Sequence, residues 1–216
     1  MVLWRFLFKE KLSISEFTKQ IGNGRRKFEK CYITRNNSHQ IKSYPSTEIK
    51  KEDPIRLYEC SFQNVELNEL YIPYIQGERN VFYQVSFNNT ILTEAHLDHS
   101  QIIDCQFEAT DLTDSYILHS RIYCCKIRDT DFENTSLIDT LFENTDLDNV
   151  NLTLATLCRT SFKSCRLNRV ILLEAKGLDL TRDLETSTLT GIEVSQRELE
   201  ILKKTQPQKY KIIPDN

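Results

Sequence analysis

The chain has 216 residues, of which 39% are hydrophobic and 27% charged, and its formal net charge is −3. This length and composition suit one globular domain with a short appendage, and they exclude a disordered chain. No stretch approaches the roughly 18 to 20 consecutive apolar residues of a spanning helix, so we expect no membrane span.

Charge divides the chain into three segments, which we expect to be its structural units. Residues 1–54 form a basic arm with 12 Lys/Arg and 6 Asp/Glu, residues 55–175 an acidic body with 9 and 18, and residues 176–216 a C-terminal segment with 7 and 7. Such asymmetry bears on partners and solubility, not on fold. The apolar stretch Met1–Phe8 contains an arginine and lacks a small-residue cleavage site, so we expect a cytoplasmic protein rather than a secreted one.

The N-terminal arm contains one helix signal. Ser13–Glu16 is a capping box, which predicts a short helix, and Gly22–Gly24 ends it. Residues 34–53 are rich in Asn, Ser, Lys and Glu and are typical of a linker. The arm either folds back over the start of the next segment, contacts a membrane surface through Trp4 and Phe6, or serves as a partner-binding or secretion segment.

A five-residue period governs the central segment. Every fifth residue from 57 to 172 gives 24 positions, and all of them except Gly77 hold a large apolar side chain. In a second register, two residues earlier, all 18 positions from Thr90 to Ala175 hold Ala, Ser, Thr, Cys or Val. Neither the 3.6-residue period of an α-helix nor the two-residue period of a strand fits this spacing. The pattern predicts a chain that turns a corner every five residues and buries two side chains in each five.

This repeat resembles that of the pentapeptide-repeat family, whose unit reads small, Asp/Asn, Leu/Phe, polar, variable. Residues 110–114, 130–134 and 145–149 match it with Thr-Asp-Leu-Thr-Asp, Thr-Asp-Phe-Glu-Asn and Thr-Asp-Leu-Asp-Asn. The resemblance implies an all-β solenoid, a right-handed quadrilateral β-helix with four repeats per coil. About six coils would then form from residues 55–175, stacked at the roughly 4.8 Å spacing of neighbouring strands, between a short N-terminal helical arm and a C-terminal capping helix.

The cysteines are interpreted as packing residues. There are seven, an odd number, and they form no Cys-x-x-Cys pair, so a disulfide framework is not indicated. Reduced thiols, as in a cytosol, are the simplest expectation. Four cysteines fall at small inward positions of the repeat, where we expect them to act as small apolar side chains: Cys60, Cys105, Cys125 and Cys165.

The residues that follow the repeats predict a cap. Ser195–Glu198 is a second capping box, and Lys203 and Lys204 suit the C-terminal end of a helix dipole, so we expect a helix over about 195–205. In several members of the family this tail forms a two-fold dimer. The resemblance therefore implies a homodimer, with plain capping of the chain's own core as the alternative use of the same apolar residues: Leu189, Ile192, Val194, Leu199 and Leu202.

Counting in steps of twenty assigns each outward residue to one of four faces. The face built from residues 90–94, 110–114, 130–134, 150–154 and 170–174, here called the acidic face, contains no Lys or Arg, whereas the other faces mix both signs. Its carboxylates either only solvate the rod or mimic DNA phosphates for a basic groove of a protein partner. The six acidic residues are Glu94, Asp111, Asp114, Asp131, Glu133 and Glu174.

One outward column holds His99, His119 and Asp139 in consecutive coils. This ladder is a weak candidate for a metal site, and a solvated column with a His/Asp pair is the simpler interpretation. The chain has only five glycines, no nucleophile motif and no Gly-rich phosphate loop. We therefore expect no catalytic residue, no cofactor and no enzyme activity.

The resemblance also suggests a partner. Family members of the quinolone-resistance type, and the immunity proteins against topoisomerase poisons, protect DNA gyrase. This chain departs from the quinolone-resistance type in its N-terminal arm and in having no loop that breaks the phase between residues 57 and 172. The sequence thus predicts a non-enzymatic protein-binding protein, a candidate DNA mimic that binds DNA gyrase or another type II topoisomerase and does not itself bind nucleic acid. The alternative is a scaffold or delivered effector that recruits a different protein.

Overall fold

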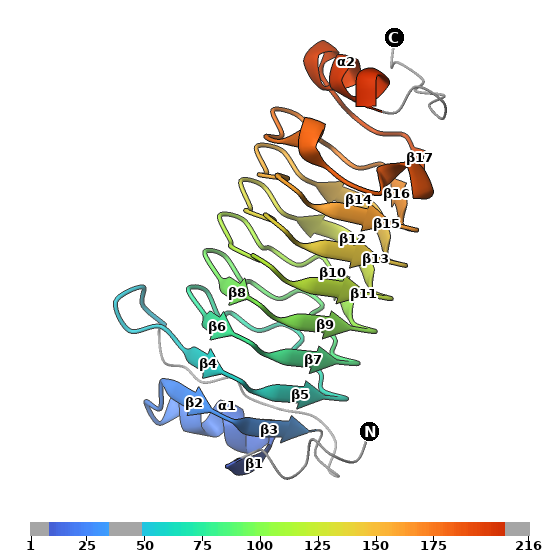
Figure 1. The fold of residues 1–216 in the computed structure, drawn as a ribbon. Coiled ribbons are helices and arrows are strands. Elements are labelled where there is room, and N and C mark those ends of the chain that lie inside the picture. The colour runs from blue at the N-terminus through green and yellow to red at the C-terminus, as the bar shows by residue number, and fades with distance from the viewer. Residues whose placement is uncertain (1–8, 35–48, 206–216) are drawn as a thin grey trace.

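The structure, a computed structural model, describes residues 9–34 and 49–205, and in them the chain winds into a parallel β-solenoid (Figure 1). This confirms the predicted solenoid of pentapeptide coils. One side of the solenoid, the eight-stranded face, gathers one strand from each of its eight turns: β1 (Glu10–Ser13), β3 (Cys31–Thr34), β5 (Ser61–Gln63), β7 (Val81–Tyr83), β9 (Gln101–Ile103), β11 (Arg121–Tyr123), β13 (Leu141–Glu143) and β15 (Ser161–Lys163).

Two further sides are also parallel sheets. The five-stranded face consists of β10 (Gln106–Glu108), β12 (Lys126–Asp131), β14 (Asp146–Asn151), β16 (Arg166–Asn168) and β17 (Thr188–Thr190). The four-stranded face consists of β2 (Lys27–Glu29), β4 (Arg56–Tyr58), β6 (Gln76–Glu78) and β8 (His96–Asp98), and isolated bridges such as His96 to Tyr116 continue it. On the fourth side the coils pair mainly through isolated bridges, among them Ile91 to Asp111 and Asp111 to Asp131.

Neighbouring coils pair residues twenty positions apart, which sets the register. Phe62 lies beside Phe82, and Ile102 beside Ile122. Backbone groups bond from coil to coil, as in the 2.8 Å bond from the N–H of Gln76 to the carbonyl of Ile55. All 23 apolar residues of the five-residue series are buried, none more than 6% exposed. The predicted core register is therefore confirmed.

The small inward residues also hydrogen-bond between coils, a role that the sequence did not indicate. Thr110 Oγ1 donates to the carbonyl of Phe87 at 2.6 Å, and Thr135 Oγ1 donates to that of Leu112 at 2.7 Å. Ser115 Oγ accepts the N–H of Ala95 at 3.1 Å. A Ser or Thr at this position thus adds hydrogen bonds to buried backbone groups, which an apolar side chain could not make.

Each corner of the coil lies in the left-handed region of backbone conformation. Every fifth residue from Glu59 to Glu174 has a positive φ, for example 54° at Asn134 and 61° at Leu154. Asn and Asp tolerate this conformation better than other non-glycine residues. The corners therefore explain the five-residue step, and they place strain at residues such as Leu154.

The N-terminal segment contributes more than a helix and a linker. Its strands β1, β2 and β3 extend the sheets, with Phe28 beside Leu57 and Ile33 beside Phe62. These partners are 29 residues apart, nine more than in a regular coil. The predicted helix is present as α1 (Ile14–Gly22), and both hydrogen bonds of its capping box form.

Helix α1 covers the N-terminal end of the core (Figure 1). This part of the arm therefore folds back over the start of the repeats, which is one of the predicted alternatives. Its Phe17 ring packs against Phe28 and Phe62, with centroids 4.7 and 5.4 Å apart. Trp4 and Phe6, and with them the alternative contacts of the arm, lie outside the described residues.

The C-terminal end carries the predicted helix, α2 (Gln196–Thr205), after two short 3₁₀ turns, η2 (Leu178–Leu180) and η3 (Leu184–Thr186). One half of the capping box forms: the side chain of buried Glu198 accepts the N–H of Ser195 at 3.1 Å, while the Ser195 hydroxyl accepts the N–H of Arg197 at 3.3 Å. None of the helices in the described ranges has the length and apolar character needed to cross a membrane.

Candidate interaction surface

The six residues of the acidic face all point outward. Asp114 and Glu174 are exposed, and the other four are half-buried. Bridges between coils stack Tyr71, Ile91, Asp111 and Asp131 in one column, so this face is a single continuous strip. The first two are among the exposed large apolar residues, with Tyr71 58% and Ile91 37% exposed. The strip therefore begins with apolar side chains, which the sequence reasoning missed, and continues with carboxylates.

Two of these carboxylates also support the backbone. An Asp111 oxygen accepts the N–H of Thr113 at 2.9 Å, and an Asp131 oxygen accepts the N–H of Glu133 at 2.8 Å. At the next position of the column, the amide oxygen of Asn151 accepts the N–H of Thr153 at 3.0 Å. Since a neutral amide makes the same turn, the turn requires an oxygen and not a negative charge.

At least half of the twelve carboxylates on the other faces are paired with Lys or Arg, a larger share than on the acidic face. Within the repeat segment, six of them lie within 4.0 Å of a Lys or Arg nitrogen: Glu59, Glu78, Asp139, Glu143, Asp146 and Asp148. On the acidic face Glu94 alone is paired in this way within residues 9–34 and 49–205, with Lys51. Counting the described residues alone, the other five have no Lys or Arg partner. The acidic face is thus the side where negative charge is least compensated.

Ion pairing lowers the pKa of several carboxyls away from the acidic face. Hydrogen bonds from Arg121 and then Lys163 lower the pKa of Glu143. A hydrogen bond from Arg159 lowers the pKa of Asp139, and one from Arg169 lowers that of Asp148. Opposite charges at hydrogen-bond distance favour the ionised carboxylate.

The two rings of the histidine ladder are stacked. The rings of His99 and His119 are parallel to within 10°, with centroids 4.9 Å apart, and His119 Nδ1 is 3.6 Å from Asp139 Oδ2. Asp139 also accepts two hydrogen bonds from Arg159, at 2.7 and 2.5 Å. Over residues 9–34 and 49–205, no three His, Cys, Asp or Glu side chains are arranged to hold a metal ion.

The four inward cysteines lie in the core, as their register predicts. Each is no more than 4% exposed, and all seven cysteines are free thiols. Burial raises the pKa of Cys165 to about 11, and a hydrogen bond with Cys105 together with burial raises that of Cys125. Deprotonation of these thiols is therefore disfavoured, whereas Cys124 is exposed.

The apolar residues proposed for a dimer differ in their accessibility. Leu189, Ile192 and Val194 pack on the core but stay partly exposed, and Leu199 is also half-buried. Leu202 is only 1% exposed, because it faces the core of its own chain. Plain capping therefore accounts for Leu202, whereas the other four keep part of their surface exposed.

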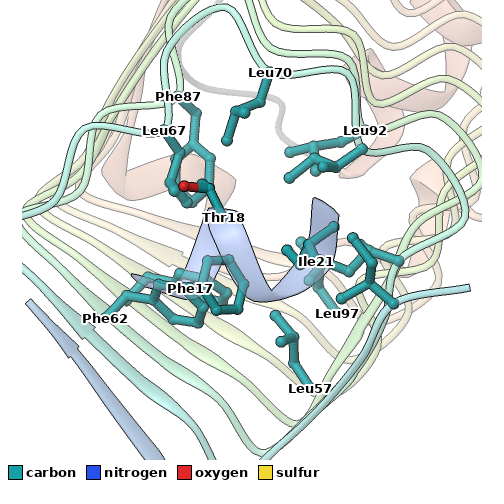
Figure 2. A pocket seen from close by; sticks show the side chains of 14 residues that line it. Phe17, Thr18, Ile21, Leu57, Phe62, Leu67, Leu70, Phe87, Leu92 and Leu97 are labelled. Carbon is teal, nitrogen blue, oxygen red and sulfur yellow. The ribbon is translucent and has the colours of Figure 1, made fainter. Parts of the chain in front are cut away.

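An apolar cavity lies between α1 and the first coils (Figure 2). Its volume is about 20 Å³, and Phe17, Thr18 and Ile21 of α1 close it opposite inward side chains such as Leu57 and Leu97. This volume is close to that of one water molecule, and the lining is apolar except for Thr18. The Thr18 hydroxyl is already bonded to the carbonyls of Ile14 and Ser15. The cavity is a packing defect rather than a ligand site.

Comparison with solved structures finds other solenoids at low similarity. A trypsin-treated variant of QnrB1, a plasmid-mediated fluoroquinolone resistance protein, is 10% identical with a TM-score of 0.43, over 94% of this chain and 97% of that one. HetL, involved in heterocyst differentiation regulation in the cyanobacterium Nostoc sp. strain PCC 7120, is 14% identical with a TM-score of 0.27, over 84% and 94%. Rfr23 from the cyanobacterium Cyanothece 51142 is 16% identical with a TM-score of 0.19, over 63% and 88%.

At these levels the three structures support no inference about activity. A search of curated proteins finds no match. The family model for pentapeptide repeats, however, matches eight copies, over residues 81–115, 125–163 and 135–172. These residues lie within the regular twenty-residue coils. Residues 81–115 and 125–172 of this chain are therefore pentapeptide repeats, as the sequence predicted.

Proposed function

We propose that this protein is a non-enzymatic binding protein that uses the acidic face to bind a protein with a basic, DNA-binding groove, with DNA gyrase or another type II topoisomerase as the candidate partner. The observation that carries the proposal is the uneven compensation of charge. At least six of the twelve carboxylates elsewhere on the repeats are ion-paired with Lys or Arg, whereas five of the six on the acidic face have no Lys or Arg partner within the described residues.

The geometry of the turns supports this proposal over simple solvation of the repeat. Asn151 holds the same turn as Asp111 and Asp131 without a charge, so the two negative charges are not needed for the fold. Regularly spaced, uncompensated carboxylates on a stiff rod produce a negative potential, which attracts a basic DNA-binding groove. Protection of the enzyme from a poison such as a quinolone would follow from competition with DNA.

The test compares wild type with two variants of equal net charge in a gyrase supercoiling assay with a quinolone present. The first neutralises the acidic face through Asp111→Asn, Asp114→Asn, Asp131→Asn and Glu133→Gln. The control neutralises four carboxylates on other faces that have no Lys or Arg partner within the described residues, through Glu69→Gln, Asp104→Asn, Glu108→Gln and Asp129→Asn.

We expect wild type and the control to protect the enzyme, the acidic-face variant to protect much less, and added salt to weaken protection. If wild type gives no protection, gyrase is not the partner. If both variants protect equally, the acidic face is only solvation.

A scaffold role is the second candidate, and one observation favours it. The outward side of the eight-stranded face carries Tyr83, Ile103 and Tyr123 as consecutive cross-strand neighbours, with Val81 beside Tyr83 along β7. Half-buried aromatic and apolar side chains on a flat sheet suit a protein contact. A pull-down from the native host with wild type and with Tyr83→Ser/Tyr123→Ser would identify a partner of this face by its loss from the double variant.

We also propose a homodimer through the C-terminal segment. The partly exposed residues Leu189, Ile192, Val194 and Leu199, together with Leu180, which is 50% exposed, would form an isologous apolar contact. Light scattering at tens of micromolar should report twice the chain mass, and Ile192→Asp should restore the monomer. A monomeric wild type at that concentration would contradict this assembly.

A further inference from the structure

A turn from the N-terminal segment reaches the acidic face. Lys50 and Asp53 form an antiparallel bridge, and the N–H of Asp53 donates to the carbonyl of Lys50 at 3.1 Å. At the tip of this turn, the Nζ of Lys51 forms a short salt bridge with Glu94 Oε2. The hydrogen bond to Glu94 raises the pKa of the Lys51 ammonium, so the lysine stays charged.

The turn is held in place by contacts on both of its sides. Ile49 before it is 4% exposed, and Ile55 after it is fully buried. Asp53 lies 3.1 Å from Arg26 Nε, which fixes the turn to the first coil. Lys51 therefore extends from an anchored position in the irregular coil, the one that is nine residues longer than the others.

The salt bridge shows what kind of group the acidic face accepts. Lys51 is the one Lys or Arg that pairs with this face among the described residues, and it comes from outside the repeats. Its side chain is 67% exposed and that of Glu94 is 35% exposed, so the pair is a solvent-accessible one. Exposed ion pairs are weak, and a multivalent basic segment can replace one.

We propose that Lys51 is an intramolecular competitor, which occupies Glu94 in the free protein and must leave it when a lysine- or arginine-bearing segment of a partner binds along the acidic face. This inference rests on the proposed function, because it takes the acidic face to be the binding surface. Beyond that function, the inference specifies that the bound segment is basic, that the chain's own contact is at Glu94, and that Lys51 lowers the affinity of the wild type for a partner.

The experiment measures binding of a fluorescein-labelled peptide of alternating lysine and arginine by anisotropy at low ionic strength. We compare wild type with Lys51→Ala and with Lys163→Ala, which removes the same charge at the eight-stranded face, where Arg121 still pairs with Glu143. Exposed ion pairs are weak, so removing the competitor should tighten binding by no more than about fivefold. Glu94→Gln in the Lys51→Ala background should cancel the gain.

The outcomes separate this inference from the proposed function. A larger gain for Lys51→Ala than for Lys163→Ala, lost with Glu94→Gln, supports the competitor. Equal gains for the two lysine variants overturn the competitor. The acidic face remains the binding surface if the fourfold acidic-face variant of the gyrase test binds the peptide more weakly than the fourfold control variant of that test. If those two fourfold variants bind equally, the acidic face is not the surface and both proposals fall.

Discussion

Gly77 is an exception in the series of large apolar residues, and Asn80 is an exception in the series of small inward residues. The two exceptions compensate each other, and this can be tested. Asn80 Oδ1 accepts the N–H of Cys60 at 2.9 Å, and its Nδ2 donates to the carbonyl of Leu57 at 3.1 Å. These are the two bonds that Ser115 makes one face away, with Ala95 and Leu92. Asn80 thus replaces the usual hydroxyl with a longer side chain.

The extra length of Asn80 fits only because residue 77 has no side chain. A Cβ at Gly77 would lie 2.7 Å from Asn80 Nδ2, 3.2 Å from the carbonyl oxygen of His96 and 3.3 Å from Leu97 Cδ2. Overpacking of this kind costs about 1–3 kcal/mol, so Gly77→Leu alone should destabilise the protein. Asn80→Ser alone should cost less, because serine can make both hydrogen bonds.

The double variant Gly77→Leu/Asn80→Ser restores both inward registers. The introduced leucine would then bury a side chain worth about 1.5–3 kcal/mol between Leu57 and Leu97, and no amide would clash with it. We expect a free energy of unfolding at least equal to that of wild type, and a coupling above about 1 kcal/mol between the two sites. Urea unfolding followed by far-UV circular dichroism measures all four proteins. Simple additivity of the two single changes would refute the compensation.

Three further predictions follow from the corners, the ion pairs and the thiols. Leu154→Asn should stabilise the protein by about 0.5–1 kcal/mol in thermal unfolding, because φ is 61° there; a loss would contradict corner strain. Arg121 lowers the pKa of Glu143, so below about pH 5 the folded state binds fewer protons than the unfolded state. The pair therefore stabilises the fold above pH 4.5, and this contribution to the free energy of unfolding is lost as the pH falls further. Arg121→Gln should therefore flatten urea stability between about pH 5 and pH 3, and an unchanged slope would argue against the pair. An aromatic disulfide reagent should label exposed Cys124 in the folded protein and buried Cys165 only after unfolding, as mass spectrometry would show.

The period predicted the regular coils because each coil repeats one local rule. A side chain such as Phe107 points into the core because the chain turns one corner in every five residues. Counting in steps of twenty, four such corners, places the acidic residues on one face of the solenoid. Both capping boxes were also local signals. The first coil escaped prediction because Phe28 and Ile33 are five residues apart but 29 residues from their partners, out of phase with residue 57.

The contact between Lys51 and Glu94 could not be read from spacing either. It depends on where an irregular coil returns to the solenoid, which no repeat rule specifies. The burial of Leu202 likewise depends on how α2 is placed over the last coil, and its helical pattern alone did not distinguish a core face from a dimer face. The hydrogen bonds of the inward hydroxyls depend on the stacking of coils, so composition indicated only that these residues are small.

The acidic face can be altered without altering the fold because the two sets of residues are separate. Inward side chains and coil-to-coil backbone bonds hold the solenoid, and each coil contacts only its neighbours. Asn134 and Asn151 already stand at corner and turn positions of the acidic face, so amides in place of Asp111, Asp114 and Asp131 follow examples within the same chain. Neutralisation should then lower the local field while far-UV circular dichroism and urea stability stay within about 0.5 kcal/mol of wild type. A loss of binding under those conditions is electrostatic, whereas a loss accompanied by unfolding would show that the carboxylates hold the coils.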